Sequence, residues 1–100
     1  MAFLLWDPKD PDDVLDYVVD WTAVLSATEA IITSEWEITP VSATDPLTKD
    51  SDEIVSPDAQ KTRIWLSGGN PGVTYLVVNT VTTDETRTFE RTVKLKVKDL

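Results

Sequence analysis

The sequence of 100 residues contains no cysteine and no histidine. Without cysteine the chain has no disulfides, so a packed core alone must stabilise its fold. The two absences together exclude zinc sites built from Cys and His, and also the Ser-His-Asp and Cys-His arrangements of nucleophilic enzymes. An enzyme would have to work with carboxylates only. The composition therefore predicts a protein that is not an enzyme and that needs no cofactor.

Long apolar segments are also absent. The longest apolar runs extend over a few residues, far short of the roughly 20 that are needed to cross a bilayer. The first residues, Met1 to Trp6, have neither the basic start nor the longer apolar stretch of a secretion signal. We expect no membrane association and a mature chain that is the encoded one. The length suffices for one core, which predicts a single domain over residues 1–100.

Acidic residues outnumber basic ones, and the net charge is −9. Residues 1–58 hold fourteen acidic and two basic side chains, whereas residues 59–100 hold four acidic and seven basic ones. A negative net charge repels the phosphates of nucleic acids, so no nucleic acid partner is expected. The uneven distribution predicts ion pairs between strands of the fold, contacts between copies of the protein, or both.

Glycine is scarce, and all three glycines lie in one segment. Gly68, Gly69 and Gly72 fall within Ile64 to Tyr75, which reads as a strand, a tight corner and the start of a second strand. Glycine tolerates the positive φ that a tight reversal requires. Tyr75 stands where immunoglobulin-like sandwiches have a tyrosine whose hydroxyl bonds back to the preceding loop. This segment predicts an immunoglobulin-like fold.

Apolar and polar residues alternate over several segments with the period of two that is typical of half-buried strands. The segments with this alternation are residues 15–22, 32–38, 61–66, 74–82 and 87–97. Trp21 and Trp36 fall on inward positions, and Trp36 lies on the third predicted strand, where immunoglobulin domains bury a tryptophan. We therefore predict an all-β, immunoglobulin-like antiparallel β-sandwich of about seven strands.

The last predicted strand carries a row of lysines on its outward face. Lys94, Lys96 and Lys98 alternate with the inward residues of this strand. A lysine row on a terminal strand commonly prevents unwanted pairing at a sheet edge. The alternative is a docking surface for an acidic partner, so these three lysines are candidate interface residues.

Two acidic segments lack a regular strand pattern. Residues 41–60 are predicted to form an acidic crossover loop, with one or two short edge strands at most. Residues 1–13 are predicted to form an N-terminal arm and a stiff, solvated linker with two Asp-Pro steps. Neither segment has the glycine-containing loop of a calcium site, and a domain of this size has no room for the cleft of a glycosidase. No metal site is expected.

Two of the four tryptophans have no place in the predicted core. Trp65 takes an outward position on its strand, so we expect its ring to be exposed. Trp6 belongs to an apolar N-terminal hexapeptide with Phe3 and Leu4, which either adds a first strand to the domain's own sheet or docks on a neighbouring subunit. Because exposed tryptophans are typical of protein interfaces and sugar-binding platforms, these four residues are further interface candidates.

Two segments are distinctive enough to indicate a protein family, whereas alternating valines and threonines occur in any sandwich. They are Asp-Tyr-Val-Val-Asp-Trp at residues 16–21 and Trp-Leu-Ser-Gly-Gly at residues 65–69. Together with Trp36, Asn79 and the strand at 87–97, they resemble the small immunoglobulin-like accessory proteins of tailed bacteriophage particles, the phage-fibre-like or capsid-decoration group. This group has no catalytic residues to carry over to the present chain.

The resemblance implies a non-enzymatic structural protein of the virion, in capsid decoration or in a neck or fibre component, assembled in the cytoplasm of the bacterial host. The partners that it implies are other virion proteins, namely capsid, portal, neck or tail subunits. The unassigned aromatics and the uneven charge add the expectation of a homo-oligomer. An immunoglobulin-like module that binds carbohydrate or a cell-surface partner remains the alternative, because such folds host many unrelated functions.

Overall fold

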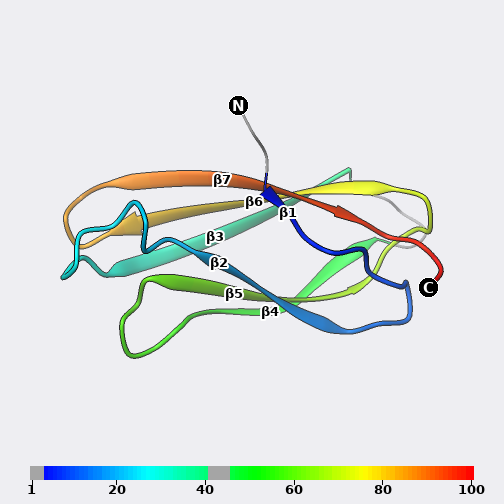
Figure 1. Ribbon diagram of the computed structural model, residues 1–100, viewed down its shortest axis with the longest axis horizontal. Coiled ribbons are helices and arrows are strands. Elements are labelled where there is room, and N and C mark those ends of the chain that lie inside the picture. Colours follow the sequence, from blue (N-terminus) through cyan, green and yellow to red (C-terminus); the bar gives the residue numbers. More distant parts are fainter. Residues whose placement is uncertain (1–3, 41–45) are drawn as a thin grey trace.

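The computed structural model describes residues 4–40 and 46–100. Within these residues the chain forms seven strands in two sheets and no helix. The four-stranded sheet has the order β1 (Leu4–Leu5), β7 (Thr88–Lys96), β6 (Thr74–Thr83) and β3 (Ile31–Thr39). The three-stranded sheet has the order β2 (Leu15–Asp20), β5 (Lys61–Gly68) and β4 (Leu47–Ile54). Figure 1 shows two layers, with β7 and β6 above and β5 and β4 below. The prediction of an all-β sandwich of about seven strands is confirmed.

Strand pairing is antiparallel except at β1. Leu4 and Leu5 pair in parallel with Val93 and Lys94 of β7, and the Trp6 backbone N–H donates to the Lys94 carbonyl at 3.1 Å. The two-residue β1 is thus a parallel addition to an otherwise antiparallel sandwich. Antiparallel hairpins carry a turn signal between neighbouring segments, whereas a parallel pair joins segments that can lie far apart in the sequence. Nothing in the sequence near residues 4–5 indicates β7 as their partner.

The core lies between the two sheets and consists of two apolar clusters. One cluster contains Leu47, Ile64, Leu66, Tyr75, Val77, Leu95 and Val97, and the other contains Val19, Trp21, Leu25, Ile31, Val81 and Val93. Trp21 is 1% exposed, and its indole N–H lies 3.2 Å from both the Thr62 hydroxyl and the Asn79 side-chain oxygen. The only polar atom of this ring is therefore satisfied inside the core.

Trp36 lies on β3 at the edge of the four-stranded sheet and is only half-buried. It packs against both clusters, but no described strand lies beyond β3 to cover it. The fully buried tryptophan between the sheets is Trp21, which corrects the assignment of this role to Trp36. At the start of β3 a register shift leaves Ile31 buried and Ile32 exposed. Simple alternation cannot predict this reversal, because a bulge places two residues opposite one.

Residues 41–60 contain a longer strand than the sequence indicated. β4 extends over eight residues and pairs with β5 at the edge of its sheet. Only Leu47 is fully buried, and a register shift between Lys49 and Ser51 interrupts the alternation. An edge strand with one buried face can be almost entirely polar, which is why the segment resembled a loop. The part of the predicted loop at residues 41–45 lies outside the described residues.

The glycine-rich corner joins β5 to β6 as predicted. The Tyr75 ring is fully buried, and its hydroxyl accepts a hydrogen bond from the Asn70 backbone N–H at 2.8 Å. Gly69 has a φ of +102°, and a Cβ at this position would lie 2.7 Å from a methyl group of Val97. Glycine is therefore needed here both for its backbone conformation and for the close approach of the last strand.

Candidate interaction surfaces

Trp65 lies on the outer face of the three-stranded sheet. The alternation of β5 buries Ile64 and Leu66 and leaves Trp65 39% exposed, as predicted. Across the sheet, Trp65 is in register with Asp16 of β2 and Ser51 of β4. The ring therefore lies in the middle of an exposed sheet face, with a strand on each side.

Two valines extend the apolar surface around Trp65. Val18 is 39% exposed and is in register with Arg63, two residues before Trp65 on β5. Val14, just before β2, is 56% exposed. We call Val14, Val18 and Trp65 the Trp65 strip. Apolar side chains that gather on one sheet face differ from the single exposed apolar residues that are normal on any surface.

Carboxylates surround the Trp65 strip. The Arg63 guanidinium lies 3.3 Å from the Asp16 carboxylate and 2.7 Å from the Glu53 carboxylate. Asp50 accepts a hydrogen bond from the Ser67 hydroxyl at 2.9 Å. One guanidinium between two carboxylates leaves negative charge in excess. Because all of these groups reach solvent, their ion pairs add little to the stability of the fold.

The lysine row lies on the outer face of the other sheet. Lys94, Lys96 and Lys98 are all exposed. Lys94 is in register with Leu5 of β1 on one side and with Leu76 of β6 on the other. Because β1 pairs with β7 at residues 93–94, the lysine-bearing strand is not a free sheet edge at this point. Protection of a terminal edge therefore does not explain the position of Lys94.

Trp6 contacts its own domain. Its ring stacks on Tyr17 with the ring centroids 4.5 Å apart, and it packs against both core clusters. Burial, with smaller effects of Asp13 and Asp7, raises the pKa of Tyr17 to about 12. The aromatic pair closes the side of the sandwich between β2 and β1. Trp6 is therefore an intramolecular element, and of the two hypotheses for the hexapeptide the structure supports the first strand.

The described leucines of the hexapeptide are more exposed to solvent than Trp6. Leu4 is 47% exposed beside Val93, and Leu5 is 76% exposed beside Lys94. Phe3 lies outside the described residues. The structure thus brings the exposed leucines next to the lysine row, whereas Trp65 is on the opposite sheet.

Lys9 is a buried lysine in the segment that the sequence predicted to be a solvated linker. Its Nζ donates to the carbonyls of Asp10 and Gly68, both at 2.8 Å, and its backbone N–H donates to the Lys96 carbonyl at 2.9 Å. Burial lowers the pKa of Lys9, although neighbouring aspartates act in the opposite direction. The linker prediction is wrong here, because the long apolar stem of lysine can be buried while its ammonium group binds carbonyl oxygens.

An ion pair between a buried carboxylate and an exposed guanidinium joins two loops at the other end of the sandwich. Glu29 is 1% exposed and binds Arg87, with the Arg87 Nε donating at 3.0 Å. Thr83 and the Ser26 backbone N–H also donate to this carboxylate. Arg87 first of all, and then Thr83 and Ser26, hold the pKa of Glu29 down at about 2 against the effect of burial. Sequence reasoning missed this pair, whose members are 58 positions apart.

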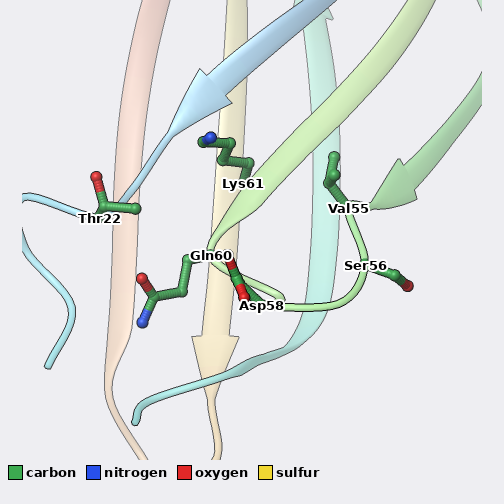
Figure 2. Close-up of a pocket in the computed structure, with 6 residues that line it drawn as sticks. All are labelled: Thr22, Val55, Ser56, Asp58, Gln60 and Lys61. Atoms are coloured by element: carbon green, nitrogen blue, oxygen red, sulfur yellow. The ribbon is translucent and has the colours of Figure 1, made fainter. Parts of the chain in front are cut away.

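The hollow in Figure 2 lies beside the loop between β4 and β5. It is lined by Thr22, Val55, Ser56, Asp58, Gln60 and Lys61, and its volume is about 100 Å³. That volume suits a few waters, each of which occupies about 30 Å³. Ser56 points away from Gln60, whose amide N–H₂ already donates to the carbonyls of Ser26 and Glu29. The lining groups do not converge on one reacting position.

The described residues contain no group of three or more His, Cys, Asp or Glu side chains placed to hold a metal ion. In the same part of the chain, no helix is long and apolar enough to span a membrane. The two exposed sheet faces carry the candidate surfaces described above. Small all-β sandwiches host many unrelated functions, among them structural and binding modules that act through their surfaces.

Comparison with protein families identifies the family to which this chain belongs. The family model described as "Podophage GP4 fiber-tail adaptor protein gp77" matches residues 9–96. The match covers most of the chain, so the protein belongs to this family of structural phage proteins. No curated protein matches the sequence. The predicted resemblance to accessory proteins of the phage virion is confirmed at this level.

Proposed function

We propose that this protein is a non-enzymatic adaptor that joins a fibre to the tail in a podophage virion. The observation that carries the proposal is the family match over residues 9–96, since the family is described as a fibre-tail adaptor. The matched range includes the strands β2 to β7. The proposal therefore applies to nearly the whole fold rather than to one segment of it.

An immunoglobulin-like architecture is part of this proposal. The sheet order β2-β5-β4 and the order β7-β6-β3 correspond to the B-E-D and G-F-C orders of immunoglobulin domains. The bond between the Tyr75 hydroxyl and Asn70 supports the same assignment, because it corresponds to the tyrosine corner of such domains. Immunoglobulin-like sandwiches suit an adaptor, since both of their outer faces can carry contacts.

An adaptor needs at least two contact surfaces, and the two sheet faces supply candidates for them. The Trp65 strip offers an apolar surface with an acidic surround, and the lysine row offers a basic one beside Leu5. We propose fibre and tail proteins of the same virion as the partners, with the adaptor present in several copies. Assembly would then take place in the host cytoplasm, where virion proteins meet.

The geometry also supports a function without catalysis. In the hollow beside the loop between β4 and β5, Ser56 points away from Gln60, whose amide is bound to backbone carbonyls. The described residues also line two wider hollows, of about 280 and 400 Å³. A general acid or base needs to lie within hydrogen-bond reach of a bound substrate. Contact through the sheet faces needs no such site.

The proposal can be tested by binding assays with purified fibre and tail proteins of the same phage. Wild-type protein should bind at least one fibre and one tail protein. Trp65→Ala should weaken one of these contacts by about tenfold or more, because large aromatics dominate interface energies. Ile32→Ala is the matched control, since Ile32 is also an exposed apolar residue but lies on the other sheet.

Two results would overturn the proposal. One is a wild-type protein that binds neither fibre nor tail proteins. The other is binding to a glycan array through Trp65 without binding to any virion protein, which would establish the carbohydrate-binding alternative. Because Trp65 is exposed, its replacement should leave the thermal midpoint nearly unchanged, and a midpoint measurement checks this.

A further inference from the structure

The two outer faces of the sandwich carry surfaces that match each other in character. On the three-stranded sheet, the Trp65 strip lies among the acidic residues Asp16, Asp20, Asp50 and Glu53. We call this surface the acidic face. On the four-stranded sheet, the lysine row lies between Leu5 and Leu76. We call the lysine row with these two leucines the lysine face. Each surface combines apolar area with charge, and the charges have opposite signs.

The acidic face keeps its negative charge despite its own ion pairs. Arg63 is shared between Asp16 and Glu53, so one positive charge is set against two negative ones. Asp20 lies opposite Lys61 in the sheet register. The Asp50 carboxylate accepts a hydrogen bond from the hydroxyl of Ser67, which is neutral and does not offset its charge. The four carboxylates thus exceed the two basic side chains on the same face.

The lysine face itself is positive, whereas Glu35, Glu37 and Glu90 lie around a separate hollow on the same side of the four-stranded sheet. Lys96 and Lys98 form no ion pair within the described residues. Leu5, beside Lys94, is 76% exposed, which makes it the most exposed of the large apolar side chains described. A basic surface with an exposed leucine suits an acidic surface with an exposed tryptophan, because apolar contact supplies affinity while charge sets the orientation.

The two faces cannot meet within one molecule. They lie on the outer sides of different sheets, and the core clusters fill the space between those sheets. A two-fold symmetric dimer does not join them either, since a single two-fold contact places the same surface of each copy together. Acidic face against acidic face, or lysine face against lysine face, would bring like charges together.

We infer that the acidic face of one copy binds the lysine face of a second copy. This inference rests on the proposed function, to which it adds the mode of self-association. The contact is heterologous, so a pair of bound copies still presents one free acidic face and one free lysine face. Repetition of such a contact produces a ring if the rotation between copies closes and an open array if it does not. An adaptor built in this way would form a continuous collar of copies between fibre and tail.

Two variants, each with one altered face, test this inference. Trp65→Lys places a positive charge in the acidic face, and the double variant K94E/K96E reverses the charge of the lysine face. Both changes are at exposed positions, so both variants should keep the circular dichroism spectrum and thermal midpoint of the wild type. Association is measured by analytical ultracentrifugation of wild type, each variant and their equimolar mixture at low salt.

The heterologous contact has a distinctive signature in these mixtures. Wild type should form species larger than dimers, and each variant alone should be monomeric. The equimolar mixture should form dimers and nothing larger, because each variant keeps the one face that the other variant needs. Raising the salt from about 0.05 M to about 0.5 M should weaken the association about tenfold, since exposed charges are then screened.

Several results would overturn the inference. A wild type that stays monomeric at low salt would contradict self-association, and a mixture that stays monomeric would contradict the pairing of these two faces. A variant that forms dimers alone would indicate a two-fold contact instead. Binding of fibre and tail proteins is measured separately with the monomeric variants. If the wild type does not self-associate but still binds fibre or tail proteins, the self-association inference fails. The proposed adaptor function is not affected by that result.

Discussion

Glu29 is a buried carboxylate whose ionised form the fold stabilises. Its pKa is about 2 in the folded protein, against an ordinary value of 4.5, chiefly because Arg87 binds it. A lowered folded-state pKa means that the unfolded chain takes up a proton more readily. The contribution of Glu29 to stability is therefore complete above about pH 4.5 and is lost as the pH falls toward about 2.

This linkage predicts the behaviour of Glu29→Gln. The variant should have a lower thermal midpoint at neutral pH, because Arg87 loses its charged partner. Its midpoint should also depend less on pH between about 4.5 and about 2 than that of the wild type. Thermal unfolding at a series of pH values measures both effects. Equal acid slopes in the two proteins would show that Glu29 is not the group responsible.

Trp21 and Trp36 differ in burial, and their truncations should differ in cost. Trp21→Ala should lower the free energy of unfolding by about 4 kcal/mol, since it removes a fully buried ring that also binds Thr62 and Asn79. Trp36→Ala should cost about half as much, roughly 2 kcal/mol, because its ring lies at a sheet edge. Urea unfolding compares the two variants. Equal losses, or a larger loss at Trp36, would contradict the burial that we describe.

At the scale of elements, the N-terminal segment is expected to stabilise its own domain. Deleting residues 1–6 removes β1 and the stack of Trp6 on Tyr17. The truncated protein should fold with a free energy of unfolding lower by about 3 kcal/mol. Trp6→Ala should reproduce most of this loss, whereas the control Leu5→Ala should be nearly neutral because Leu5 is exposed. An unchanged midpoint after the deletion would show that the segment serves a neighbouring subunit instead.

The corner between β5 and β6 allows a comparison of two glycines. Gly69→Ala places a Cβ against Val97 and also strains the backbone, so it should cost about 3 kcal/mol. Gly72→Ala has the strain without the contact, since nothing lies within 4 Å of its Cβ position, and should cost about 1 kcal/mol. Urea midpoints give the difference. Equal costs would mean that the approach of Val97 is unimportant.

The strands that the sequence predicted best are those with one regular inward face. β6 buries Tyr75, Val77 and Val81 in strict alternation, and the alternation alone identifies it. β4 was difficult because its single buried face and its register shift leave almost no apolar pattern. β1 is two residues long and has a distant parallel partner, for which the sequence contains no local signal.

For the candidate surfaces too, the sequence predicted the residues that lie along one strand and missed the contacts between distant loops. The exposure of Trp65 and of the lysine row follows from alternation along one strand, which the sequence shows directly. The burial of Lys9 and the pairing of Glu29 with Arg87 depend on loops that meet only in the folded molecule. Composition places lysine and glutamate on the surface by default, so no sequence pattern indicated either residue.

At the scale of the whole molecule, the fold is a thin sandwich of 41 × 28 × 22 Å with contrasting outer faces. The acidic first part and the basic last part of the sequence alternate within the sheets, since basic β5 lies between β2 and β4 and the lysine-bearing β7 shares its sheet with acidic β3. Such a molecule can bind a partner on each side. This property connects the fold with the adaptor function that the family membership supports.

The proposed adaptor function places this protein in the phage particle at the joint between fibre and tail. Cryo-electron microscopy of purified virions tests it most directly, because the two-layered sandwich and its large aromatic residues can be recognised in the density. We predict that the sandwich occupies a fixed number of positions between fibre and tail, in contact with both. Its absence from the particle, or its presence on the capsid surface alone, would rule out the adaptor function.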